Sequence, residues 1–157
     1  DAMDARAVAE RIGLSHEILE AKEAFESHVI RDFVRSYESG LTPNPCIQCN
    51  HHLKFGLMLR YGLEQGWNYV VSGHYARIRQ DDATGRFLLY KAADQAKDQT
   101  YFLASLNQHQ LSHILFPLGG LTKTEVRRIA EEKYDVNKVN LTIRNAMGIE
   151  ENVYEPV

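Results

Sequence analysis

The sequence is poor in cysteine, and this limits the kinds of protein that it can encode. Cys46 and Cys49 are the two cysteines among 157 residues. A pair only three positions apart makes a poor disulfide framework, which argues against a small secreted, disulfide-stabilised domain and favours a reducing, cytoplasmic compartment. Structural zinc normally takes four protein ligands, often as two separated pairs, and the sequence has no second cysteine pair.

Long apolar runs and an excess of positive charge are also missing. No apolar stretch approaches the roughly 20 residues that cross a membrane, and residues 1–4 do not resemble a signal peptide, so we expect no membrane association. The formal net charge is −3, from 18 Lys and Arg against 21 Asp and Glu. Binding to RNA would therefore depend on local clusters of basic side chains, because affinity for phosphates depends on clustered cations.

What is present is the composition of an ordinary globular protein, with 44% hydrophobic and 25% charged residues. Apolar periodicity and turn residues predict helices at 4–12, 21–39, 54–64, 99–105, 108–113 and from 122 onward, strands at 14–19 and 67–72, and a hairpin with arms at 77–79 and 86–91. Helices that alternate with short strands predict a layered α/β fold. Tyr101, Phe102 and Phe116 are spaced with nearby leucines, which predicts core packing rather than a base-stacking surface.

The most informative stretch is Thr42-Pro43-Asn44-Pro45-Cys46-Ile47-Gln48-Cys49-Asn50. Asn44 predicts a helix cap and Pro45 the first helical position. Both thiols would then lie near the positive end of the helix dipole, where a thiol more readily becomes the nucleophilic thiolate. The residues alone leave three interpretations open: sulfur chemistry, a small zinc-binding domain that also uses His51 or His52, or merely a buried cysteine in a helix.

The same stretch resembles the cysteine motif of tRNA-specific 2-thiouridylases of the MnmA type. Three further blocks follow in the family's order: Ser72-Gly73-His74-Tyr75-Ala76-Arg77, Lys97-Asp98-Gln99-Thr100-Tyr101-Phe102-Leu103 and Leu115-Phe116-Pro117-Leu118-Gly119. The resemblance implies an α/β fold: an incomplete parallel-sheet nucleotide-binding domain, similar to adenine nucleotide alpha hydrolases, with a β-hairpin and C-terminal helices. Residues 1–133 would form a partial catalytic domain of the PP-loop ATPase type, and residues 134–157 a divergent tail.

The activity that this resemblance implies is ATP-dependent 2-thiolation of the wobble uridine of tRNA, a tRNA uridine 2-sulfurtransferase reaction. ATP, with Mg²⁺, adenylates the C2 oxygen of the base, and a cysteine persulfide then delivers sulfur as AMP leaves. The persulfide sulfur would come from a donor protein, either a sulfur-relay protein or a cysteine desulfurase.

The resemblance also implies roles for individual residues. Cys49 would be the catalytic nucleophile that pairs with the persulfide-carrying cysteine, and Gly73 would contact ATP. The residues expected to contact tRNA are Asn44, Pro45, Cys46, His74, Lys97, Asp98 and Gln99. No metal ligand is implied. Plainer interpretations stay open: His74 as a hydrogen-bonding partner of nearby backbone, and Asp98 as the polar start of a helix.

Two segments of the family pattern do not occur in this sequence. One is the phosphate-binding Ser-Gly-Gly-x-Asp-Ser loop, since the only Gly-Gly pair, Gly119-Gly120, is followed by neither Ser nor Asp. The other is a Gly-Ile-Cys-like segment, in whose place residues 143–150 contain no cysteine. We therefore expect part of a catalytic domain that does not complete the reaction alone. The alternative is a non-catalytic remnant that binds RNA or nucleotide.

Overall fold

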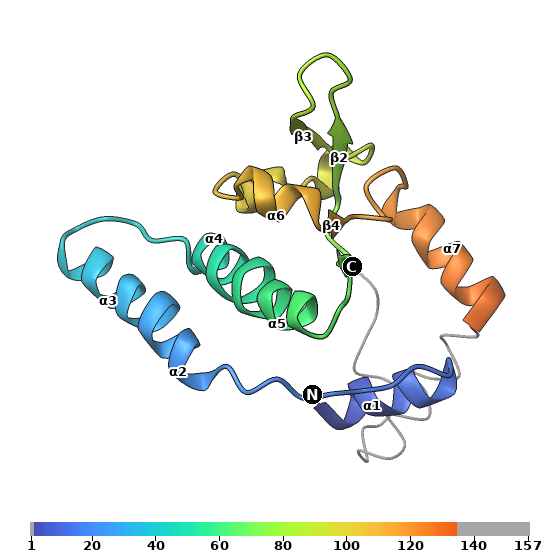
Figure 1. The fold of residues 1–157 in the computed structure, drawn as a ribbon, viewed down its shortest axis with the longest axis horizontal. Coiled ribbons are helices and arrows are strands. Elements are labelled where there is room, and N and C mark those ends of the chain that lie inside the picture. Colours follow the sequence, from blue (N-terminus) through green and yellow to red (C-terminus); the bar gives the residue numbers. More distant parts are fainter. Residues whose placement is uncertain (1, 135–157) are drawn as a thin grey trace, which may run out of the picture. The chain divides into compact units, whose positions relative to one another are not determined.

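The computed structural model describes residues 2–134, which divide into two compact units. One unit comprises residues 19–123, and the described part of the other comprises residues 2–18 and 124–134 (Figure 1). In the described part of the chain, no helix combines the length and the apolar character needed to cross a bilayer. The predicted tail lies outside the described residues except for Tyr134.

The smaller unit contains α1 (Ala2–Arg11) and nearly all of α7 (Lys123–Tyr134), which confirms the helices predicted at its two ends. The strand predicted at 14–19 is wrong, because this stretch forms no regular structure. A short apolar run becomes a strand only when another strand takes up its backbone hydrogen bonds, and no described strand pairs with it. Leu14 and Ile18 are accordingly exposed.

In the larger unit, the helix predicted at 21–39 is present as three successive segments: α2 (Lys22–Phe25), the π-helical η1 (Glu26–Ile30) and α3 (Arg31–Glu38). Gly40 follows with a φ of 74°, a left-handed conformation that suits glycine at a helix end. Of the apolar side chains at four-residue spacing, Val29 is buried, whereas Phe25, Phe33 and Tyr37 are exposed.

The cysteines lie on a second continuous helix, made of α4 (Pro45–Gln48), the π-helical η2 (Cys49–Leu57) and α5 (Met58–Glu64). We call residues 45–64 the cysteine helix. The prediction of a helix start at Asn44-Pro45 is confirmed. The helix predicted at 54–64 is also confirmed, but it continues the helix that begins at Pro45 and is not a separate one. This helix lies beside the α2–α3 helix (Figure 1).

Two small sheets complete the larger unit. β1 (Val70–Val71) and β4 (Ile114–Leu115) are parallel, with Val70 opposite Ile114. β2 (Ala76–Gln80) and β3 (Phe87–Lys91) form the predicted antiparallel hairpin. The strand predicted at 67–72 is present but short, and Val71 on it is exposed rather than buried. The α/β fold with a parallel sheet and a hairpin is thus confirmed.

Three short helices connect these sheets: η3 (Gln95–Lys97), η4 (Thr100–Leu103) and α6 (Gln108–Ser112). The predicted cap of α6 is confirmed, because the Asn107 side chain accepts from the Gln110 N–H and the Gln110 side chain accepts from the Asn107 N–H.

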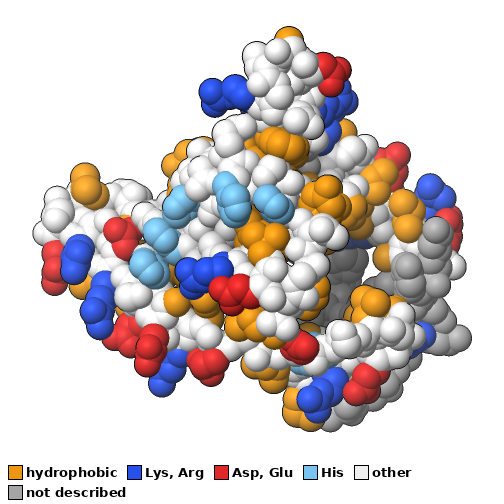
Figure 2. All heavy atoms as spheres, viewed as in Figure 1, with side chains coloured by type: hydrophobic (Ala, Val, Ile, Leu, Met, Phe, Trp, Pro, Cys, Tyr) orange, Lys and Arg blue, Asp and Glu red, His pale blue; other side chains and the backbone are white. Residues whose placement is uncertain are grey.

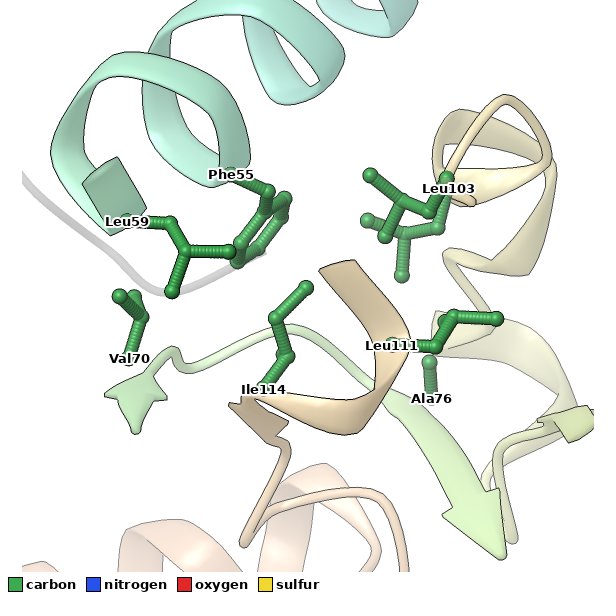
Figure 3. Packing of buried hydrophobic residues seen from close by; sticks show 8 residues of the cluster. Phe55, Leu59, Val70, Ala76, Leu103, Leu111 and Ile114 are labelled. Carbon is green, nitrogen blue, oxygen red and sulfur yellow. The ribbon is translucent and has the colours of Figure 1, made fainter. Parts of the chain in front are cut away.

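The core packs the cysteine helix against the parallel strands and the segments around them (Figure 3). Its buried members are Phe55, Leu59, Val70, Ala76, Leu103, Leu106, Leu111 and Ile114. Phe116 packs against this cluster as predicted, and Phe102 is half-buried. The prediction that Tyr101 is a core residue is wrong, since 66% of it is exposed. The tight 3₁₀ turn of η4 directs Leu103 inward, and Tyr101 two positions earlier faces another direction.

Candidate functional site

The cysteine helix, the segment after β1 and the segment after η3 line one pocket of about 280 Å³. Its lining residues are Cys46, Cys49, Asn50, Lys54, His74, Gln99 and Phe102. The fold therefore brings together predicted site residues from three separate sequence blocks. Gly73 directly precedes His74 in the sequence, and Lys97 and Asp98 directly precede Gln99. None of these three is among the residues that line the pocket.

The start of the cysteine helix has the predicted cap geometry. Asn44 is extended, with φ −119° and ψ 92°, and its Oδ1 accepts a hydrogen bond from the Cys46 N–H at 3.2 Å. Pro45 occupies the first helical turn, where its missing N–H costs nothing. Cys46 is exposed, Cys49 is half-buried, and both are free thiols. Two thiols thus lie in the first turns of a long helix, near the positive end of its dipole.

Asn50 joins the cysteine helix to η4 and was not singled out from the sequence. It is 2% exposed, and its Nδ2 donates to the Phe102 carbonyl oxygen at 2.9 Å. Its Oδ1 is buried and has no hydrogen-bond partner in the described part of the chain. An unpaired buried acceptor is costly and therefore uncommon, so this amide at the wall of a pocket is notable. Its position directly after Cys49 was the available sequence signal.

His74 lines the pocket and is largely buried. Its Nδ1 lies 2.7 Å from the Ser72 Oγ, and its ring packs 5.8 Å from each of the rings of Phe55 and Phe116. Burial lowers the pKa of His74, and the nearby charge of Lys54 lowers it further. The imidazole is therefore neutral at pH 7 and can act as a hydrogen-bond donor or acceptor but not as a cation.

Gly73 is exposed, and the fold around it does not itself require glycine. Its φ lies outside the left-handed region, and a Cβ at this position would meet the Leu118 side chain at 3.6 Å, an ordinary van der Waals contact. A need for glycine here would have to come from a ligand that approaches the backbone closely.

Gln99 is held against the segment that follows His74. Its backbone N–H donates to the Tyr75 carbonyl oxygen, and its side-chain Oε1 accepts from the Tyr75 N–H, both at 2.9 Å. The oxygen of the side chain is thus engaged within the protein. The Nε2 hydrogens remain as the part of this amide that is suited to a ligand in the pocket.

Asp98 holds the backbone in place just before η4, which agrees with its interpretation as the polar start of a helix. One carboxylate oxygen accepts from the Ala92 N–H at 2.7 Å, and the other accepts from the Thr100 hydroxyl at 2.6 Å. Burial opposes ionisation of Asp98, but these hydrogen bonds, together with the charge of Lys91, outweigh it and lower its pKa. The carboxylate therefore fixes the turn that leads from the exposed Lys97 to Gln99.

Among the described residues, no group of three or more His, Cys, Asp and Glu side chains is arranged to hold a metal, so these residues offer no ligand set for zinc. His51 and His52 are not among the lining residues of the pocket. The His52 ring stacks on the His28 ring at 4.3 Å and meets the His51 ring edge-on at 4.6 Å. Figure 2 shows histidine side chains gathered on one face.

A larger pocket, of about 620 Å³, lies elsewhere in the larger unit and contains none of the predicted site residues. Its walls come from β1, β2 and β4 and the residues around them, among them Val71, Ile78 and Leu115. We therefore place the candidate site at the smaller pocket, where the chemistry-bearing side chains meet.

Comparison with known proteins agrees with the residue pattern. The model of the family described as "tRNA methyl transferase HUP domain" matches residues 1–142. The chain is 51% identical over 130 residues to a protein of Acidobacterium capsulatum and 49% identical over 130 residues to one of Solibacter usitatus. It is 46% identical over 149 residues to a protein of Verminephrobacter eiseniae. Each of these relatives is named "tRNA-specific 2-thiouridylase MnmA".

These matches cover most of this chain but a smaller share of the relatives. They span 83% of the chain for the first two relatives and 95% for the third. The same matches span 35% of the length of the first two relatives and 40% of the third. The stretch 143–150, where the resemblance predicts a second cysteine segment, lies outside the described residues.

Proposed function

We propose that this chain, which belongs to the tRNA methyl transferase HUP domain family, is part of an enzyme that thiolates C2 of the wobble uridine in tRNA with the use of ATP. The observation that carries the proposal is the shared pocket of Cys46, Cys49, His74 and Gln99, which come from separate blocks of the sequence. The names of the relatives support the same activity.

Cys49 is the residue that we assign to sulfur transfer. In the reaction, the C2 oxygen of uridine attacks the α-phosphate of ATP and pyrophosphate leaves. The terminal sulfur of a cysteine persulfide then attacks C2, and AMP departs with the oxygen. The Cys49 thiolate then attacks the inner sulfur of the persulfide cysteine, so that a disulfide forms between the two cysteines and the terminal sulfur stays on C2. A thiol reductant afterwards reduces this disulfide. A half-buried thiol at a helix start is suited to that attack.

The polar groups around the thiols are suited to hold the tRNA. Neutral His74 and the Nε2 of Gln99 can make directional hydrogen bonds to a base. Asn44, Pro45 and Cys46 at the helix start would contact the target base, and the exposed Lys97 would contact phosphate. Asp98 would act indirectly, because both of its oxygens already hold the turn before Gln99.

The remaining assignments rest on the family resemblance and stay predictions. Gly73 would allow ATP to approach the backbone, and Mg²⁺ would accompany the ATP. A sulfur-relay protein or a cysteine desulfurase would supply the persulfide sulfur, and the reaction would take place in the cytoplasm. Residues 1–133 would form the partial catalytic domain and residues 134–157 the divergent tail.

The test is a thiolation assay with the whole encoded protein, a tRNA transcript with uridine at the wobble position, ATP and a persulfide source. We expect 2-thiouridine in the digested tRNA by mass spectrometry, and none when ATP is omitted. A protein that binds the tRNA, with affinity that falls steeply as salt rises, but forms no 2-thiouridine would instead be the non-catalytic remnant.

A further inference from the structure

The cysteine helix is π-helical through the residues that follow Cys49, and this changes which side chains share a face with that thiol. In an α-helix, the residue one turn beyond Cys49 is Leu53, and Lys54 stands above Asn50. A π-helix forms i→i+5 hydrogen bonds, and η2 extends from Cys49 to Leu57. The residue one turn beyond Cys49 is therefore Lys54, and both line the same pocket.

Two features of the fold sustain this wider turn. Gly56 is five residues after His51, and a Cβ at Gly56 would lie 2.8 Å from the His51 carbonyl oxygen, which is too close for an ordinary contact. The buried side chain of Gln110 donates from Nε2 to the carbonyl oxygens of His51 and Phe55, at 3.0 and 2.9 Å. The π-helical geometry is thus anchored by α6, far away in the sequence, and permitted by a glycine.

Lys54 is the one cationic side chain among the described residues that line the pocket. The titratable groups that face the pocket are Cys46 on α4, Cys49 and Lys54 on η2, and His74 after β1. The segment from Gln99 to Phe102 contributes an amide and a phenyl ring but no charge. Because His74 is buried and neutral, Lys54 is the available positive charge for an anion that forms here.

We infer that the π-helical turn of η2 aligns Lys54 with Cys49 so that the Lys54 ammonium stabilises the Cys49 thiolate and speeds its attack on electrophilic sulfur. The inference deepens the proposed function, since it names a second residue of the same sulfur-transfer site. Lys54 acts through Cys49 and is a positioning and electrostatic residue rather than the nucleophile. A cation beside a thiol favours the charged, reactive form.

The experiment measures alkylation of Cys49 by iodoacetamide in the whole encoded protein, without tRNA or ATP, from pH 6 to pH 10, with modified peptides resolved by mass spectrometry. In Lys54→Met we expect the rate at pH 7 to fall on the order of tenfold, as for loss of one nearby charge, and the pH–rate profile to move to higher pH. Lys54→Arg keeps the charge and should restore most of the rate. Arg60→Met, which removes an exposed cation of the same helix outside the pocket, should alkylate like the unmodified protein.

A second variant tests the geometry rather than the charge. Gly56→Ala places a methyl group against the His51 carbonyl oxygen and should shift Lys54 away from Cys49 while the ammonium is kept. We expect slower alkylation of Cys49 in a protein whose circular dichroism spectrum is unchanged. If iodoacetamide alkylates Cys49 at the same rate in Lys54→Met and in Arg60→Met, the inference is overturned.

The inference and the proposed function can fail separately. If the unmodified protein thiolates tRNA while Lys54→Met alkylates normally, the function stands and the role of Lys54 falls. If no thiolation occurs but Lys54→Met slows alkylation as expected, the role of Lys54 stands and the proposed function falls.

Discussion

The side-chain amide of Asn50 donates to the carbonyl oxygen of Phe102 at 2.9 Å, and this bond joins two blocks that are 52 residues apart in the sequence. One block carries the thiols and the other carries Lys97, Asp98 and Gln99. The bond therefore fixes the distance between the groups proposed for sulfur transfer and those proposed for RNA contact.

Replacement of Asn50 should weaken the whole unit. In Asn50→Leu the Phe102 carbonyl oxygen loses its donor inside the protein, and we expect the free energy of unfolding to fall by about 1–3 kcal/mol. Urea unfolding followed by circular dichroism measures it. The matched change Asn68→Leu, at an exposed asparagine, should alter the free energy by less than about 0.5 kcal/mol. Equal effects of the two changes would show that the bond to Phe102 contributes nothing.

The histidines between the two long helices should make stability depend on pH. Burial lowers the pKa of His52 from its ordinary value of 6.5, and the neighbouring His28 and His51 lower it further, against the opposing effect of Asp32. Because the folded state then favours the neutral ring, the contribution of His52 to stability is fully present above pH 6.5 and is lost as the pH falls below it.

Thermal unfolding between pH 8 and pH 5 measures this effect. The midpoint temperature of unfolding should fall as the pH is lowered toward 5. In His52→Gln this midpoint should fall less steeply, because the glutamine side chain cannot be protonated. His109→Gln, which lies outside this histidine group, should follow the unmodified protein. Parallel curves for His52→Gln and the unmodified protein would contradict the assignment.

The Gly-Gly pair at 119–120, which does not match the family's phosphate loop, has a structural role at its first position. A Cβ on Gly119 would overlap the carbonyl oxygen of Ala76 on β2, whereas a Cβ on Gly120 would meet nothing within 4 Å. We expect Gly119→Ala to destabilise the protein by about 1–3 kcal/mol, as overpacking does. Gly120→Ala is the matched control and should be nearly neutral. Similar urea midpoints for the two variants would refute this packing argument.

Gly73 differs from Gly119, because the fold has room for a side chain at position 73. Only a bound ligand that approaches the backbone would require glycine there. A Cβ there makes only an ordinary contact with Leu118, so Gly73→Ala should unfold like the unmodified protein. If ATP approaches this backbone, an overlap that costs about 1.4 kcal/mol would weaken ATP binding about tenfold. Calorimetric titration of the whole encoded protein with ATP measures it. Unchanged affinity would remove Gly73 from the nucleotide site.

Local chemistry made part of this structure predictable. The cap at Asn44 followed from its side chain and from Pro45, and the hairpin followed from the turn residues that end at Gly85, whose φ is 69°. The motif resemblance identified Cys49 and Gln99 as site candidates, and the fold places both on one pocket.

Features that depend on distant contacts could not be read from local patterns. The π-helical turn after Cys49 relies on Gln110, which is more than 50 residues away, and its spacing differs from the α-helical period that sequence analysis assumes. The apolar alternation at 14–19 indicated a strand, but strand formation needs a partner that the pattern cannot show. The spacing of Tyr101 with nearby leucines predicts core packing, but Tyr101 lies two positions before the inward-facing Leu103, and residues two apart do not share a face of a helix.

The proposed role of Cys49 is tested by the yield of 2-thiouridine in tRNA treated with the Cys49→Ser and Cys46→Ser variants of the whole encoded protein. We expect Cys49→Ser to form none, because no other thiol of this pocket takes the place of the nucleophile, and we expect Cys46→Ser still to form product. Undiminished thiolation by Cys49→Ser would show that Cys49 is not the nucleophile.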